Sequence, residues 1–131
     1  MSDDTQAVSQ FKSKSGLKRL ASALAYSVAG LRTAWRYEHA FRQELMVVVP
    51  ATVLALLLPV SRLEKLALVA VLLLVLIAEL MNSAIEAVVD RVSLDRHPLS
   101  KNAKDLGSAA VLLACVLALA TWGAIVAPLI L

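Results

Sequence analysis

Residues 66–89 read LALVAVLLLVLIAELMNSAIEAVV. Of these 24 residues, only Glu79 and Glu86 carry a charge. The hydrocarbon core of a bilayer is about 30 Å thick, and a helix rising about 1.5 Å per residue needs roughly 20 apolar residues to cross it. The stretch therefore predicts a membrane-spanning helix that holds a carboxyl group, Glu79, at hydrocarbon depth.

Two further stretches, Leu45–Ser61 and Leu106–Leu131, contain no charged residue. Both are continuously apolar and lack the alternation typical of membrane β-strands. Hydrophobic residues make up 60% of the 131-residue chain, against roughly 45–50% in soluble proteins. This composition excludes a soluble monomer. The length fits one domain and excludes a nucleotide-binding domain with a second module.

Ahead of the first span, apolar residues recur every three or four positions, at Leu17, Leu20, Leu24, Val28, Leu31 and Trp35. This spacing predicts an amphipathic helix in the membrane interface, or alternatively one packed on partner helices. We expect an all-α membrane protein whose parts are a disordered extension (1–15), an interfacial helix (16–38), transmembrane helices (41–61, 64–90 and 104–130) and a cytoplasmic loop (91–103).

The basic residues are unevenly placed. Of the 13 Lys and Arg, seven lie at or before Arg42, two (Arg62 and Lys65) follow the first span, four lie between Arg91 and Lys104, and none follows Lys104. Lys and Arg favour the cytoplasmic side of a membrane. We therefore expect the N-terminus and the 91–103 loop in the cytoplasm, with the C-terminus outside. The basic charge then meets anionic lipid, and no nucleic acid is expected as a partner.

Polar side chains recur along the second span with helical spacing, at Glu79, Asn82, Ser83, Glu86 and Asp90. At about 100° per residue they share one face of the helix. A carboxyl group in lipid is costly unless it is protonated, paired or bound to a metal ion. Three interpretations remain open here: polar contacts that hold an oligomer together, an ion- or proton-coupled transporter, and a catalytic or metal site.

Ligand chemistry favours the third interpretation. Carboxylates with an Asn amide, and no Cys or His beside them in the spans, suit a hard cation such as Mg²⁺, which keeps waters and shares its shell with phosphates. The four glycines form no Walker-type phosphate loop, and no protein-kinase signature is present. Spacing alone therefore indicates a metal-dependent site at the inner membrane face.

The run Glu79–Arg91 (ELMNSAIEAVVDR), followed by Ala103–Val111 (AKDLGSAAV) and preceded by Glu38–Glu44 (EHAFRQE), resembles the bacterial integral-membrane diacylglycerol kinases. The resemblance covers roughly Arg19–Trp122. It implies a homotrimer with three transmembrane helices and a surface helix, which uses MgATP to phosphorylate the primary hydroxyl of diacylglycerol. A related branch phosphorylates undecaprenol, and Phe41–Glu44 favours the diacylglycerol branch. A small oligomeric transporter is the alternative from another class.

The resemblance also implies residue roles. Glu79 matches the catalytic base, Asn82 supports its site, and Glu38 and Glu86 match the carboxylates that hold Mg²⁺. Positions that contact the nucleotide correspond to Arg19, Tyr26, Asp95, His97, Lys104 and Asp105. Positions that contact the lipid correspond to Arg32, Trp35, Glu44 and Ser108, together with Glu79. The small residues Gly107–Ala110 are predicted to form a close helix contact, which packing explains without catalysis.

Overall fold

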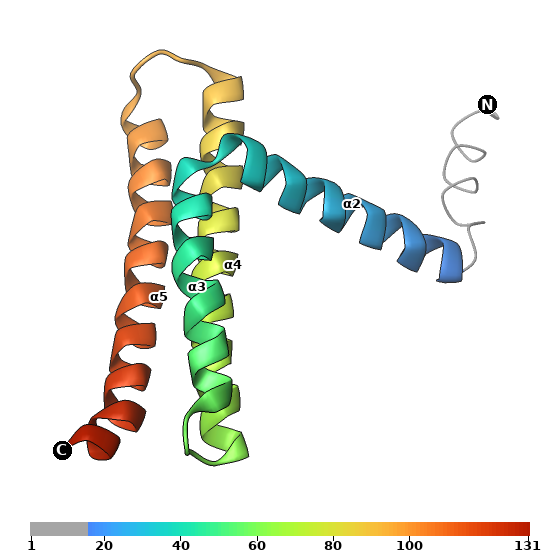
Figure 1. Ribbon diagram of the computed structural model, residues 1–131. Coiled ribbons are helices and arrows are strands. Elements are labelled where there is room, and N and C mark those ends of the chain that lie inside the picture. The colour runs from blue at the N-terminus through green and yellow to red at the C-terminus, as the bar shows by residue number, and fades with distance from the viewer. Residues whose placement is uncertain (1–15) are drawn as a thin grey trace. The chain divides into compact units, whose positions relative to one another are not determined.

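A computed structural model describes residues 16–131, and within them every regular element is an α-helix. In chain order the helices are α2 (Gly16–Tyr37), α3 (His39–Leu57), α4 (Arg62–Val92) and α5 (Pro98–Ile130) (Figure 1). The predicted all-α fold class is confirmed. The expected disordered extension, residues 1–15, lies outside the described residues. The chain divides into two units, residues 1–36 and residues 37–131, which are described separately.

The first unit contains most of α2. The apolar stripe of this helix is uncovered within the chain: Leu17 is 79% exposed, Leu24 66% and Trp35 50%. A stripe of this kind is suited to the interface of a membrane or to a partner helix. Helix α2 ends at Tyr37, and Glu38 adopts an extended backbone (φ −100°, ψ 105°) before α3 begins.

The second unit contains three helices long and apolar enough to cross a membrane, with mean hydropathies of 1.6 for α3 and 2.4 for both α4 and α5. At about 1.5 Å per residue, the 19, 31 and 33 residues of these helices reach roughly 28, 46 and 50 Å. Each approaches or exceeds the hydrocarbon thickness of about 30 Å. The chain is therefore a multi-pass membrane protein with three spans.

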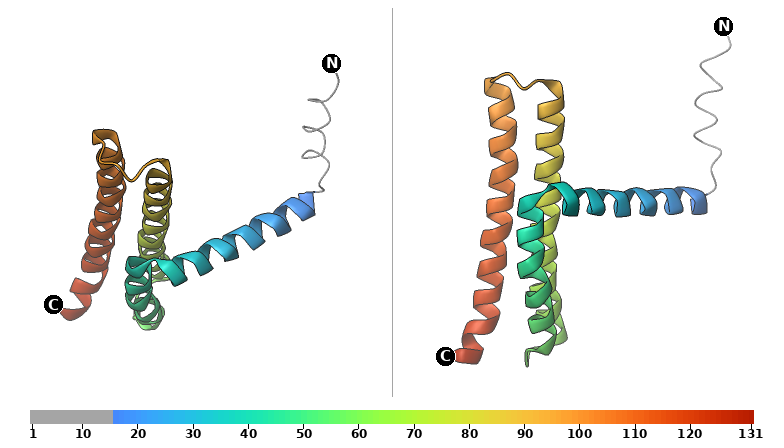
Figure 2. Two further views of the ribbon diagram at one scale, coloured as in Figure 1. Left: turned by 90° about the horizontal axis from the view of Figure 1, so that it is seen from above. Right: turned by 45° about the horizontal axis from the view of Figure 1, so that its top comes forward.

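Helix α4 packs against both α3 and α5 (Figure 1). Because α3 is much shorter, the last part of α4 and the first part of α5 extend past the start of α3, where they join through the turn at 93–97 (Figure 2). One face of α4 is thereby covered along the middle of the helix, and its C-terminal end is left more open.

Two prolines set helix ends. The residue before a proline is biased toward extended backbone, and Leu58 (ψ 143°) and His97 (ψ 137°) both show it. Helix α3 therefore stops ahead of Pro59. Helix α5 begins with Pro98 at its first turn, a favoured position, six residues before the predicted transmembrane range 104–130. That range, like the other predicted boundaries of the membrane-embedded parts, stays a prediction.

Helices α4 and α5 are held together by an apolar cluster in the half of the hairpin away from the 93–97 turn. Its buried members are Val71, Val75, Ala114 and Ala118, with Ala78, Cys115 and Trp122 packed against them. The indole Nε1 of Trp122 donates a hydrogen bond to the backbone oxygen of Leu68 at 3.2 Å. This contact fixes α5 against α4 and so determines which residues face each other nearer the turn.

Candidate active site

Four polar side chains of α4 lie at three- or four-residue spacing and become more exposed toward its C-terminus. Glu79 is 6% exposed and Asn82 9%, Glu86 is half-buried, and Asp90 is exposed. This gradient follows from the packing, because α3 and α5 cover the middle of α4 and leave its end open. The stripe therefore leads from the surface of the hairpin to a buried carboxyl group.

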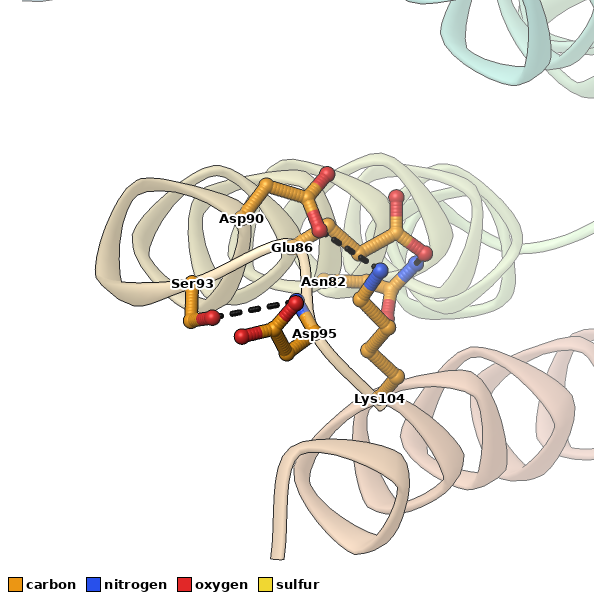
Figure 3. Close-up of polar contacts among 6 residues, drawn as sticks. All are labelled: Asn82, Glu86, Asp90, Ser93, Asp95 and Lys104. Carbon is orange, nitrogen blue, oxygen red and sulfur yellow. Dashed lines mark hydrogen bonds and ion pairs between the residues drawn. The ribbon is translucent and has the colours of Figure 1, made fainter. Parts of the chain in front are cut away.

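Asn82 connects two members of this stripe. Its Nδ2 donates a hydrogen bond to Glu86 Oε1 at 3.4 Å (Figure 3). Its Oδ1 is buried and has no hydrogen-bond partner within residues 16–131. The amide thus orients the Glu86 carboxylate while its own carbonyl oxygen lies against α5 at Gly107.

Helix α3 adds a further carboxyl group to the buried site. Glu44 is half-buried, and its Oε2 is buried without a partner among the described residues. Glu79 interacts electrostatically with three other carboxyl groups: Glu44, Glu86 and Glu38, the last at the N-cap of α3. An unpaired buried oxygen costs free energy, so a ligand that donates a hydrogen bond, such as an alcohol, would be favoured here.

A basic side chain from α5 faces this acidic stripe. Lys104 extends toward α4 in Figure 3, and its Nζ lies 2.7 Å from Asp90 Oδ1. Both side chains are about half exposed, 41% and 51%, and exposed ion pairs contribute only about 0–1 kcal/mol. Lys104 can therefore exchange Asp90 for an incoming anion at little cost.

An open pocket of about 610 Å³ lies beside Lys104, where α4 turns into α5. Three of the predicted nucleotide-binding residues, Asp95, His97 and Lys104, line it together with Asp90. Asp105, another of these predicted residues, is exposed and pairs with Lys101 one turn earlier on α5 at 2.5 Å. His97 Nδ1 accepts the backbone N–H of Leu99 at 3.1 Å, so this imidazole also caps α5.

Four of the remaining predicted residues, Arg19, Tyr26, Arg32 and Trp35, lie on α2 in the first unit, whereas the carboxylates lie in the second. Ser108 is exposed on α5. Their predicted roles stay predictions.

Two residues that the predicted site omitted contact it. Asp90 binds Lys104, and Gly107 packs on Asn82. The spacing of the stripe already included Asp90, so the sequence signal existed. Nothing in the spacing of α5 indicated that Gly107 would face Asn82.

The residues present fit Mg²⁺ held jointly with phosphates. Within residues 16–131, no three His, Cys, Asp or Glu side chains cluster as a metal cage. Mg²⁺ is usually bound in phosphoryl-transfer enzymes by one or two carboxylates, several waters and the substrate phosphates. Glu86, whose carboxylate is oriented by Asn82, and Glu38, which like Glu86 interacts electrostatically with Glu79, would supply a donor set of that kind.

Known proteins resemble the chain over most of its length. The profile of the family described as prokaryotic diacylglycerol kinase matches residues 25–126. A protein named diacylglycerol kinase from Pseudomonas aeruginosa is 56% identical over 117 residues, covering 89% of this chain and 95% of that protein. The protein of that name from Escherichia coli (strain K12) is 50% identical, over 82% of this chain and 88% of its own length. The one from Haemophilus influenzae is 40% identical, over 84% of this chain and 93% of its own length.

Proposed function

The chain belongs to the prokaryotic diacylglycerol kinase family and is therefore a membrane lipid kinase that acts on diacylglycerol, and we propose which role each residue has in the phosphoryl transfer. The γ-phosphate of ATP passes to the primary hydroxyl of 1,2-diacylglycerol. The hydroxyl oxygen forms a bond to the γ-phosphorus, the bond from that phosphorus to the ADP oxygen breaks, and the hydroxyl proton goes to Glu79. The products are phosphatidic acid and ADP, as phospholipid turnover and recycling require.

The burial of Glu79 carries this assignment. Its carboxyl group lies deepest in the α4 stripe, 6% exposed, where α3 and α5 pack on the middle of this apolar helix. A lipid alcohol reaches such a group from within the bilayer. A general base contributes about 10²–10⁴-fold to a rate when it sits within hydrogen-bond reach of the proton. Glu44, with its unpartnered Oε2, is suited to receive the same alcohol as a hydrogen-bond donor.

The ATP phosphates are proposed to bind at the exposed, C-terminal end of the α4 stripe. A bound Mg²⁺ would supply positive charge to offset the charge on the phosphate oxygens. Glu38 and Glu86 are proposed to hold it, with the Asn82 amide fixing the orientation of Glu86. Lys104 exchanges Asp90 for phosphate, and the adjoining pocket takes the remainder of the nucleotide at Asp95 and His97.

The other assignments follow the family resemblance. Arg19, Tyr26 and Asp105 contact the nucleotide, and Arg32, Trp35 and Ser108 contact the lipid. The enzyme acts as a homotrimer in the inner membrane with this site on the cytoplasmic side. Within one chain only 17% and 11% of the residues in the most apolar stretches of α3 and α5 are buried, which leaves surface for contact with lipid and with the other copies of the trimer.

An ATPase assay on the purified protein in mixed micelles tests the proposal. ATP consumption is expected to require both Mg²⁺ and added 1,2-diacylglycerol, with phosphatidic acid formed in equal amount. Undecaprenol serves as the comparison substrate at the same mole fraction. A higher kcat/KM with undecaprenol, or ATP consumption without any added alcohol, would contradict diacylglycerol as the substrate.

A further inference from the structure

At Gly107 of α5, the space that a Cβ would take is filled by the end of the Asn82 side chain from α4. A Cβ built on Gly107 would overlap Asn82 Oδ1 and lie 3.3 Å from Asn82 Cγ. Cβ contacts below about 3 Å do not persist in packed proteins, because interiors already have close-packed density. The Asn82 side chain therefore occupies the space that any other residue at position 107 would need.

This close approach sets the direction of the Asn82 amide. Asn82 is 9% exposed, and its carbonyl oxygen lies over the bare Cα of Gly107. Since the amide is planar, fixing Oδ1 against α5 fixes Nδ2 on the opposite side. There Nδ2 donates to Glu86 Oε1 at 3.4 Å.

The feature is specific to this glycine. A Cβ added at Gly16, Gly30 or Gly123 would meet no heavy atom within 4 Å. Gly107 is also buried, whereas its neighbours Ser108, Ala109 and Ala110 are exposed within the chain. Close packing of small residues would not by itself require glycine at position 107. Glycine is needed there because the Asn82 amide fills the space that a side chain would take.

We propose that Gly107 is a positioning residue: it lets Asn82 lie flat against α5, and Asn82 in turn holds the Glu86 carboxylate in its binding orientation. This inference rests on the proposed role of Glu86. A side chain at position 107 forces Asn82 into another rotamer, and the hydrogen bond to Glu86 is lost. Displacing a catalytic group by about 1 Å can cost about 10²-fold in rate.

A double-mutant cycle between Gly107→Ala and Asn82→Ala tests the contact. The three atoms nearest to a Cβ at position 107 all belong to Asn82, and of these only Cα, at 3.6 Å, remains after Asn82→Ala. Gly107→Ala is therefore expected to lower the midpoint of unfolding by SDS in the wild-type background and not in the Asn82→Ala background. If the single variant does not fold, the double variant is expected to recover the fold. Equal destabilisation in both backgrounds, or a double variant that also fails to fold, overturns the proposal.

Kinetics then separate positioning from packing. Gly107→Ala should reduce kcat by about 10²-fold, raise the Mg²⁺ concentration needed for half-maximal rate, and leave the KM for diacylglycerol unchanged. In the Asn82→Ala background it should reduce kcat no further. Gly123→Ala, on the same helix with open space around it, is the matched control and should retain wild-type kinetics.

The possible failures are distinguishable. A wild-type kcat in Gly107→Ala, or a loss that adds fully to that of Asn82→Ala, overturns the positioning role and leaves the kinase assignment intact. If the wild-type protein does not phosphorylate diacylglycerol, the proposed function fails, and the unfolding cycle still decides whether Gly107 holds Asn82.

Discussion

At the scale of the residue, the cost of burying polar groups supports the side chains proposed to serve the reaction. Glu79 and Asn82 lie below 10% exposure on a helix that contains hydrocarbon-facing leucines. A charged or unpaired polar group in such surroundings costs several kcal/mol. Apolar residues at these positions would make a more stable bundle. The retention of a buried carboxyl group and a half-satisfied amide is therefore best explained by the chemistry they perform.

Glu79→Gln should separate catalysis from folding. The substitution keeps the volume and removes the proton acceptor, so we expect phosphorylation to fall by at least about 10²–10⁴-fold. The stability should be unchanged or higher, since an amide is easier to bury than a carboxylate. The measurement is the rate of phosphatidic acid formation by purified protein, alongside the midpoint of unfolding by SDS.

Glu64→Gln is the matched control for this variant. Glu64 is an exposed carboxylate on the same helix, 15 residues and about 22 Å before Glu79, and Gln can replace Glu in its capping role. Its rate should equal that of the wild type. A Glu79→Gln enzyme that retained a tenth of the wild-type rate would exclude Glu79 as the base, and loss of assembly would indicate a structural role instead.

Glu86→Gln tests the metal assignment. Gln keeps an oxygen that can accept the Asn82 hydrogen bond and removes the negative charge that Mg²⁺ requires. We expect a higher Mg²⁺ concentration for half-maximal rate and a higher KM for ATP, with an unchanged KM for diacylglycerol. A Mg²⁺ titration at saturating lipid measures this. An unaltered Mg²⁺ dependence would assign the metal to other residues.

At the scale of the element, the ends of the helices are set by local chemistry that is independent of the site. Ser61 and Glu64 form a reciprocal capping box at the start of α4: Ser61 Oγ accepts the Glu64 N–H at 3.2 Å, and Glu64 Oε2 accepts the Ser61 N–H at 2.8 Å. Lys65 Nζ donates to the backbone oxygen of Leu56 at 2.7 Å and satisfies a carbonyl at the end of α3. The short turn between α3 and α4 is thus held at both helix termini.

Ser61→Ala should therefore destabilise the protein without affecting turnover. Loss of an N-cap side chain costs typically about 1 kcal/mol. The cap lies 18 residues before Glu79, about 27 Å along the helix, so kcat and both KM values should stay at wild-type values. The free energy of unfolding by SDS is the measurement, and Ser61→Thr, which keeps a hydroxyl acceptor, should lose little. A change in kcat for Ser61→Ala would mean that the turn is coupled to the site.

How far the sequence predicts these elements depends on the range of the interaction. Continuous apolar runs such as residues 66–89 correctly predicted three helices able to span a membrane, because the signal lies within each run. The spacing of Glu79, Asn82 and Glu86 correctly predicted a shared face of α4. The contact of Asn82 with Gly107 was not predictable, since it depends on the register of α5 against α4, which the Trp122–Leu68 bond and the apolar cluster fix.

At the scale of the whole molecule, one chain leaves most of its apolar surface uncovered. In the most apolar 18-residue stretches of α3, α4 and α5, 17%, 33% and 11% of the residues are buried. In lipid this exposure carries no penalty of the kind it has in water, because the acyl chains are as apolar as leucine. The side chains of the spans therefore meet lipid or, as proposed for the homotrimer, other copies of the chain.

The distribution of charge over the three spans predicts how the molecule lies in the membrane. Arg91, Arg96, Lys101 and Lys104 flank the turn that joins α4 to α5, and Arg62 and Lys65 flank the opposite turn. Lys65 is in addition held by the Leu56 carbonyl. The positive-inside tendency therefore predicts that the pocket beside Lys104 faces the cytoplasm, where ATP is available, and that the C-terminus, one span further on, lies outside.

Cysteine labelling in a Cys115→Ala background checks this orientation, since Cys115 is the single native thiol. Leu94→Cys and Leu131→Cys are suitable reporters, because these side chains are 86% and 103% exposed at opposite ends of α4 and α5. With a membrane-impermeant maleimide on intact spheroplasts, position 131 should react at once and position 94 only after permeabilisation. Both variants should retain kinase activity, which shows that the labelled protein is folded. Labelling of position 94 from outside and of position 131 only after permeabilisation would reverse the orientation and put the pocket out of reach of cytoplasmic ATP.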